Sequence, residues 1–119
     1  MILAQITDMH VMPEGELFAG EVPVNDMLAA AIGRINAFRP AVDVILATGD
    51  LVEGGGAETY RALRSILAEA AAPVFLIPGN HDKADALREA FPDHAYLPAE
   101  GHLHYVIDDY PLRLIGLDT

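Results

Sequence analysis

Three short apolar runs alternate along the chain with stretches of helical periodicity. The apolar runs cover residues 2–7, 42–48 and 73–78. Their length and composition are typical of buried strands. After a candidate N-cap at Asn25, apolar side chains recur at helical spacing from Met27 to Phe38, and a second helical pattern covers residues 58–70. The alternation predicts a parallel βαβαβ unit, because right-handed crossovers place such strands side by side in one sheet.

The pattern changes after the third apolar run. A short helix is predicted over residues 83–91, where Pro92 ends it. Two further runs, over residues 102–107 and 112–117, alternate like strands and flank a turn-forming cluster at 108–111. We therefore expect an α/β fold in which a β-hairpin follows the parallel unit.

Composition restricts the possible partners of this fold. The chain has 119 residues, 52% of them hydrophobic, which suits a single modest domain with an aliphatic core. A net charge of −11 argues against a nucleic acid polymer or an anionic membrane as partner, because no basic patch is available to neutralise phosphates. The chain has no cysteine and opens directly into a predicted strand, so we expect a cytoplasmic location.

Each apolar run of the parallel unit ends in polar residues that suit metal binding. Asp8 and His10 follow the first run, Gly49-Asp50 follows the second, and Gly79-Asn80-His81-Asp82 follows the third. Ligands of open α/β sheets bind at the carboxyl ends of the strands. Carboxylate, imidazole and amide groups gathered there are suitable ligands for divalent cations. Asp8 and His10 would face the same side if the chain were extended, and would share one metal.

These blocks resemble a known family in their order and separation. Asp8-Met9-His10, Gly49-Asp50 and Gly79-Asn80-His81-Asp82 are similar to the first three blocks of the calcineurin-like metallophosphoesterases. Together with residues 6–7 and 114–119, they are most similar to the bacterial class III cyclic-nucleotide and glycerophosphodiester phosphodiesterases. The resemblance covers the whole chain. It implies the N-terminal half of a four-layer α/β/β/α sandwich, so that residues 1–119 form one partial domain without the last metal-ligand histidines.

The resemblance also implies a dinuclear metal centre. In this family two divalent ions, which would be Mn²⁺, Fe²⁺/Fe³⁺ or Zn²⁺, activate a bridging hydroxide and clamp the phosphoryl oxygens. Carried over to this chain, Asp8 and His10 bind the first metal and Asp50 bridges both. Asn80 binds the second metal, and its amide adds no further negative charge. No other cofactor is expected.

The third block would also supply the catalytic acid. The resemblance keeps His81 off the metals as proton donor to the leaving oxygen, with Asp82 orienting its ring. A role for His81 as a third metal ligand stays open. Gly101-His102-Leu103-His104 has the letters of the family's final histidine block, but it stands just before a predicted hairpin strand. We therefore expect His102 and His104 to be exposed strand histidines, with the ligand role as the alternative.

The expected activity is hydrolysis of a small phosphodiester, either a cyclic nucleotide such as cyclic AMP or a glycerophosphodiester. No arginine follows Asp50 closely, as it does in the protein-phosphatase branch, and the acidic chain disfavours a polynucleotide. The alternative is a truncated, inactive fragment that binds metal weakly. The second and third runs are apolar on both faces, so an uncovered face would favour a homo-oligomer or association with the missing C-terminal half.

Overall fold

The parallel unit expected from the sequence forms the centre of the molecule. The computed structural model describes residues 1–119, and its parallel sheet has the order β1 (Leu3–Thr7), β2 (Val44–Thr48) and β3 (Val74–Ile77). Thr7 pairs with Thr48, and Thr48 pairs with Ile77. The three strands therefore end level with one another. This register places the residues after each strand at one common edge.

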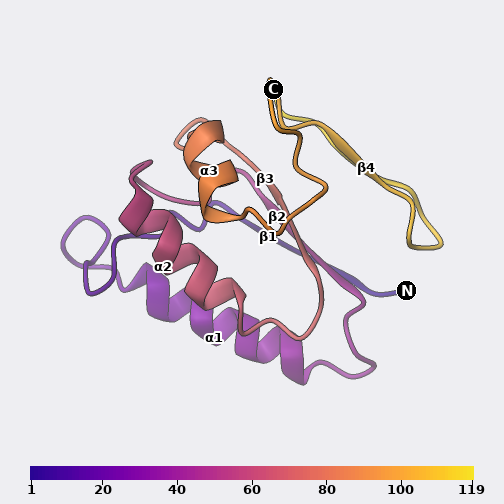
Figure 1. The fold of residues 1–119 in the computed structure, drawn as a ribbon. Helices are drawn as coiled ribbons and strands as arrows, with labels where there is room; N and C mark the ends of the chain where they lie inside the picture. The colour runs from indigo at the N-terminus through magenta and orange to yellow at the C-terminus, as the bar shows by residue number, and fades with distance from the viewer.

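Helices cover one face of this sheet, and the hairpin lies on the other side (Figure 1). The helices are α1 (Val24–Ala37), α2 (Ala57–Leu67) and the short α3 (Ala84–Ala90). Buried side chains of α1, α2 and the strands, among them Ile32, Leu63 and Ile45, form the main core. No helix of the chain is both long and apolar enough to cross a membrane.

Helix α1 contacts the sheet through a narrower stripe than the sequence predicted. Leu28 and Ile32 are buried, but Met27 is 59% exposed and Phe38 is 54% exposed. Met27 points away because adjacent helical positions face different directions, and Phe38 lies beyond the last helical residue. The assignment of Met27 and Phe38 to the core was wrong.

Asn25 does not cap helix α1 as we predicted. The helix begins at Val24, Pro23 precedes it, and no side chain caps its first turn. The amide of Asn25 instead accepts a hydrogen bond from the backbone N–H of Met12 at 2.9 Å and donates one to its carbonyl at 2.8 Å. Asn25 therefore holds the loop that follows His10 against α1.

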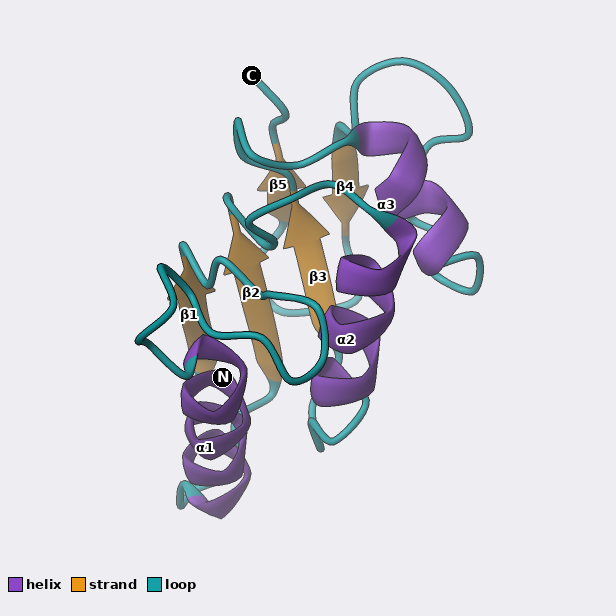
Figure 2. Cartoon of the chain, turned by 90° about the vertical axis from the view of Figure 1, so that its left-hand side faces the viewer, coloured by secondary structure: helices purple, strands orange, loops and turns teal.

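The hairpin is shorter than predicted. Strands β4 (Tyr105–Ile107) and β5 (Leu114–Gly116) pair antiparallel (Figure 2). His102 and His104 lie before β4, so their assignment to a strand was wrong, although both are exposed as expected. Tyr105 and Ile107 face inward and are buried.

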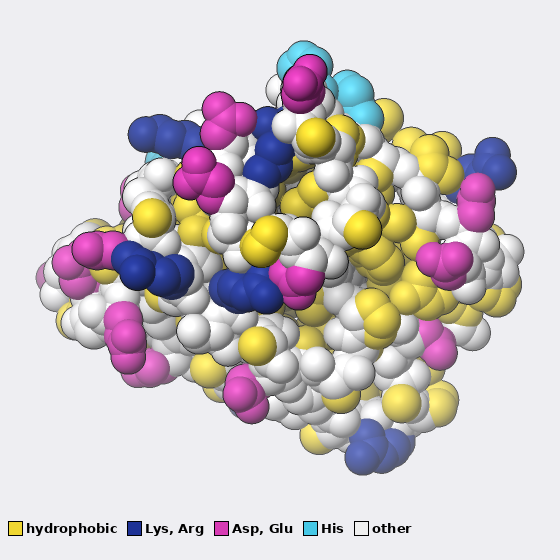
Figure 3. Space-filling view, in the orientation of Figure 1, with side chains coloured by type: hydrophobic (Ala, Val, Ile, Leu, Met, Phe, Trp, Pro, Cys, Tyr) yellow, Lys and Arg dark blue, Asp and Glu magenta, His cyan; other side chains and the backbone are white.

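The sheet face that we expected to be uncovered is partly covered by aromatic side chains. The ring of Phe75 on β3 lies 4.9 Å from that of Tyr96 and 6.3 Å from that of Tyr105. Four exposed apolar side chains lie instead on the hairpin, in the half of the molecule where Figure 3 shows hydrophobic atoms gathered. This hairpin patch consists of Val106, Leu112, Ile115 and Leu117, which are 53–63% exposed.

Candidate metal centre

Two loops run side by side beyond the ends of β1 and β2. The N–H of Asp8 donates to the carbonyl of Gly49 at 3.1 Å, and the N–H of His10 donates to the carbonyl of Asp50 at 3.0 Å. Asp8, His10 and Asp50 all have positive φ, at 52°, 45° and 44°. Non-glycine residues rarely adopt this conformation, and they cluster at functional sites. The extended geometry that we assumed for Asp8 and His10 was therefore wrong.

The left-handed turns nevertheless bring the predicted ligands together. Asp8, His10 and Asp50 each offer one ligand atom, and these atoms all lie within 4.8 Å of one another. Nε2 of His10 is 3.7 Å from Oδ2 of Asp50. Two carboxylates and one imidazole form a donor set that suits Mn²⁺, iron or Zn²⁺. The residues present therefore fit a divalent cation at this edge. We call Asp8, His10, Asp50, Glu53 and His81 together the edge cluster.

Asp50 is held in place by residues of the third polar block, Gly79-Asn80-His81-Asp82. Its Oδ1 accepts a hydrogen bond from the backbone N–H of His81 at 3.0 Å. Gly79 allows this approach, because a Cβ at position 79 would overlap the backbone nitrogen and carboxylate of Asp50. A glycine is therefore required at the end of β3 for steric reasons, independent of any metal.

Asp82 does not contact the ring of His81, as we had expected it to. Its carboxylate accepts hydrogen bonds from the backbone N–H groups of Leu51, Val52 and Gly79 at 2.7–3.1 Å, and from the hydroxyl of Tyr60 at 3.3 Å. The expected contact with the ring of His81 is absent. Asp82 therefore joins the loop after β2 to the loop after β3.

Tyr60 supports this junction, although the sequence indicated only a core position. Burial raises the pKa of its phenol, so the hydroxyl stays protonated and can donate to Asp82. The same oxygen accepts from the backbone N–H of Lys83 at 2.9 Å. The helical spacing of Tyr60 explains its burial, but it contains no signal for these contacts.

Sequence reasoning also missed Glu53. Its Oε2 lies 2.6 Å from Nδ1 of His10 and 3.5 Å from Nδ1 of His81. His10, Glu53 and His81 form a second group whose ligand atoms lie within 4.8 Å of one another. A carboxylate three residues after Asp50 was the available signal, but Glu53 lies outside the motifs from which the ligands were predicted.

The outer rim of the edge cluster consists of His81, Asn80 and Phe18. The His81 ring meets that of His10 edge to face at 5.1 Å, and the Phe18 ring, on the same β1–α1 loop as His10, lies 5.7 Å from it. Asn80 is exposed, and its amide has no hydrogen-bond partner. The structure thus places Asn80 at the exposed rim, where its side chain makes no hydrogen bond to Asp8 or Asp50.

His102 and His104 gather around another carboxylate, that of Asp118. We call these three residues the tail cluster. Their two rings stack at 5.2 Å, and Nδ1 of His102 lies 3.6 Å from Oδ2 of Asp118. The backbone N–H of Asp118 donates to Nδ1 of His104 at 3.0 Å. The tail cluster shares no ligand atoms with the edge cluster.

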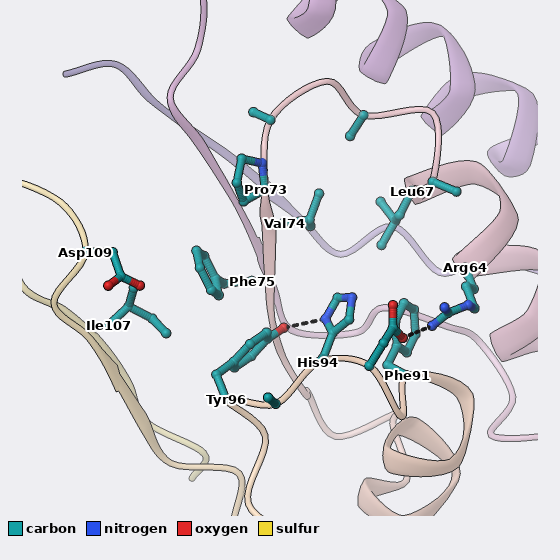
Figure 4. A pocket seen from close by; sticks show the side chains of 15 residues that line it. Arg64, Leu67, Pro73, Val74, Phe75, Phe91, His94, Tyr96, Ile107 and Asp109 are labelled. Carbon is teal, nitrogen blue, oxygen red and sulfur yellow. Dashed lines mark hydrogen bonds and ion pairs between the residues drawn. The ribbon is translucent and has the colours of Figure 1, made fainter.

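A hollow of about 550 Å³ lies at the opposite end of β3, where Pro73 and Val74 begin the strand (Figure 4). Four of its polar groups are paired with each other: Arg64 binds Asp93 at 2.6 Å, and Nδ1 of His94 is 3.0 Å from the hydroxyl of Tyr96. Burial lowers the pKa of His94. The hollow contains no group of potential metal ligands, so the candidate chemistry stays at the edge cluster.

The chain is similar to known phosphoesterases over nearly its whole length. The profile of the family described as calcineurin-like phosphoesterase matches residues 1–117. The chain is 34% identical to the probable glycerophosphodiester phosphodiesterase of Arcobacter nitrofigilis and to the glycerophosphodiester phosphodiesterase of Enterobacter lignolyticus. Each alignment covers 100% of this chain and 44% of the relative. A probable cyclic nucleotide phosphodiesterase of Rhodopseudomonas palustris is 39% identical over 73% of this chain and 31% of its own length. The chain thus spans less than half the length of these relatives.

Proposed function

Because the chain belongs to the calcineurin-like phosphoesterase family, we propose that it supplies metal ligands and the catalytic acid of a metal-dependent phosphodiesterase that hydrolyses a small phosphodiester. The convergence of Asp8, His10 and Asp50 within 4.8 Å supports this proposal. These residues come from two strands whose ends the sheet register makes level. We also propose that residues 1–119 form part of one metallophosphoesterase domain.

The metal-binding residues divide between two sites. Bound divalent cations would activate water and neutralise the phosphoryl oxygens of the substrate. Asp8 and His10 hold the first ion, and Asp50 contributes to both. Asn80 holds the second ion, for which its free and exposed amide is available.

His81 acts as the proton donor to the leaving oxygen. Its Nδ1 faces Glu53, 3.4 Å from the carbonyl and 3.5 Å from the carboxylate. Both of these groups accept hydrogen bonds, so Nδ1 carries a proton, and Nε2 gives a proton to substrate from the doubly protonated imidazolium form of the ring. The side chain is 39% exposed, which leaves it accessible at the rim of the site.

The substrate is a cyclic nucleotide such as cyclic AMP or a glycerophosphodiester. The relatives carry both kinds of name. No arginine occurs between Asp50 and Tyr60 to grip a phosphomonoester dianion. Comparing hydrolysis of cyclic AMP with that of glycerophosphocholine decides between the two substrates.

Hydrolysis of bis(p-nitrophenyl) phosphate by the Mn²⁺-loaded protein tests the activity. We expect a chelator to abolish it. His81→Ala should lower kcat by about 10²–10⁴-fold with a poor leaving group and much less with nitrophenolate, which departs without a proton. His102→Ala, an exposed histidine of the tail cluster, is the matched control. Equal losses on both substrates together with lost metal would show instead that His81 is a ligand.

Weak metal binding without catalysis is the second candidate function. The small number of ligands proposed for the second ion favours it, because Asp50 and Asn80 alone are assigned to that ion within these residues. One bound ion per chain and no hydrolysis of any of the three substrates would support this candidate.

We also propose that the hairpin patch is covered in the working protein, by a second copy or by further chain of the same protein. Large exposed apolar patches are uncommon on monomers. Light scattering tests this proposal. A monodisperse monomer would contradict it, and Ile115→Lys should disperse any oligomer.

A further inference from the structure

Glu53 lies between the two imidazoles of the edge cluster. Its backbone position is firm: the N–H of Glu53 donates to the carbonyl of Val11 at 3.0 Å, and Val52 forms a β-bridge with Val11. The loop after β2 is thereby fastened to the loop that carries His10. The carboxylate of Glu53 is 32% exposed, so it is partly shielded from water.

The two ring nitrogens of His10 face different carboxylates. Nδ1 is 2.6 Å from Oε2 of Glu53, which is hydrogen-bond distance, whereas Nε2 is 3.7 Å from Oδ2 of Asp50. A neutral imidazole has one N–H and one lone pair, and a carboxylate can only accept a hydrogen bond. With Glu53 on Nδ1, the proton belongs on Nδ1 and the lone pair on Nε2. That lone pair is on the side of Asp50.

A direct ligand role for Glu53 beside Nδ1 of His10 does not fit this distance. Two ligand atoms that each lie about 2.1 Å from one cation are about 3 Å apart at a right angle, and farther apart at a tetrahedral angle. A separation of 2.6 Å is too short for a shared cation. It is the normal separation of a charge-assisted hydrogen bond.

We propose that Glu53 is a positioning residue that locks His10 in the tautomer with the proton on Nδ1. The lone pair of Nε2 is then presented to the cation held by Asp8 and Asp50. Carboxylates commonly orient metal-binding histidines in this way, through the nitrogen remote from the metal. The inference rests on the proposed function, because it assumes that His10 is a metal ligand.

Calorimetric titration of the full chain with Mn²⁺ tests the inference. Glu53→Ala should weaken binding about 10–100-fold with unchanged stoichiometry. Glu53→Gln should recover at least part of this loss, because the amide oxygen still accepts from Nδ1. The matched control is Glu16→Ala, which removes an equal charge from an exposed residue of a surface pocket that Glu53 also lines. Its affinity should stay within about twofold of the unchanged protein, below the effect of an orienting residue.

A second readout reports the tautomer itself. Nitrogen-15 NMR of the Zn²⁺-loaded protein should show His10 protonated at Nδ1 and metal-bound at Nε2 in the unchanged protein and in Glu53→Gln. Metal bound at Nδ1 would overturn the inference. This measurement decides the matter if circular dichroism shows that Glu53→Ala does not fold.

The outcomes separate this inference from the proposed function. If Asp50→Ala abolishes binding while Glu53→Ala binds as tightly as the unchanged protein, the metal site stands and only the role of Glu53 is refuted. If Glu53→Gln binds as weakly as Glu53→Ala and with lower stoichiometry, Glu53 is a ligand and the inference fails. Absence of binding by the unchanged protein would overturn both.

Discussion

The edge cluster and the tail cluster contain the same residue types in different settings. In the edge cluster, Asp8, His10 and Asp50 arrive from loops that follow separate parallel strands. In the tail cluster, His102 and His104 precede β4 and Asp118 follows β5, so a single hairpin supplies all three. The side chain of His102 is 70% exposed, against 24% for His10. The tail cluster therefore offers less shielding from water.

The two clusters also differ in what their polar atoms already bind. Next to the edge cluster, Asp82 accepts from three backbone N–H groups, whereas Oδ2 of Asp50 accepts no hydrogen bond and Asp8 accepts one from the hydroxyl of the adjacent Thr7. In the tail cluster, the carboxylate of Asp118 accepts from the N–H of Leu103 at 2.8 Å, and Nδ1 of His104 accepts from that of Asp118. A site for an external ligand requires groups that the fold itself does not use.

Removal of a carboxylate from each cluster should give the largest difference. We expect Asp50→Ala to weaken Mn²⁺ binding by more than about 100-fold, beyond the loss typical of residues that only orient a ligand. Asp118→Ala should have less than about a twofold effect, because Asp118 lies outside the candidate ligand groups. Calorimetric titration measures both. Similar losses in the two variants would remove the distinction between the clusters.

Asp82 should matter more for stability than any residue of the tail cluster. Its replacement by Ala leaves three backbone N–H groups and one phenol without their acceptor. We expect a loss of about 3 kcal/mol in the free energy of unfolding, since hydrogen bonds to a charged group contribute about 1.5–3 kcal/mol. Urea denaturation provides the value. A loss below about 1 kcal/mol, which is the contribution of one neutral hydrogen bond, would contradict this structural role.

Replacing one glycine near each cluster by Ala should affect the two regions differently. Gly79→Ala should cost about 2 kcal/mol, as overpacking does, and should also weaken metal binding because the new Cβ displaces Asp50. Gly101→Ala has open space around it and only a φ of +71°, so it should cost about 1 kcal/mol. Its metal affinity should not change. Thermal unfolding and calorimetry of both variants test the pair.

The smallest effect should come from the histidines of the tail cluster. Replacing both His102 and His104 with Gln should change metal affinity by no more than about twofold, far below the cost of losing even an orienting residue. Titration under the conditions used for Asp50→Ala makes the comparison direct. A larger loss would mean that His102 and His104 complete a metal site, as their sequence motif alone suggests.

The order of elements and the place of the candidate site could be predicted from the sequence alone. Apolar runs ending in Asp8, Asp50 and Asn80 predicted a parallel βαβαβ unit with polar groups at one edge, and the structure and the family match confirmed that fold. This succeeded because hydrophobic periodicity is a local property, and because parallel connections place strand ends on one side.

Which polar side chains contact one another depends on the tertiary structure. The family resemblance implied that Asp82 orients the ring of His81, whereas the fold turns Asp82 toward the amides of another loop and brings Glu53 to His10. Glu53 and His10 are 43 residues apart in the chain. Their contact depends on the pairing of two loops whose left-handed residues leave no periodic signal. Contacts of that kind follow from the register and close packing of the folded chain, which are long-range properties that a pattern of neighbouring residues does not encode.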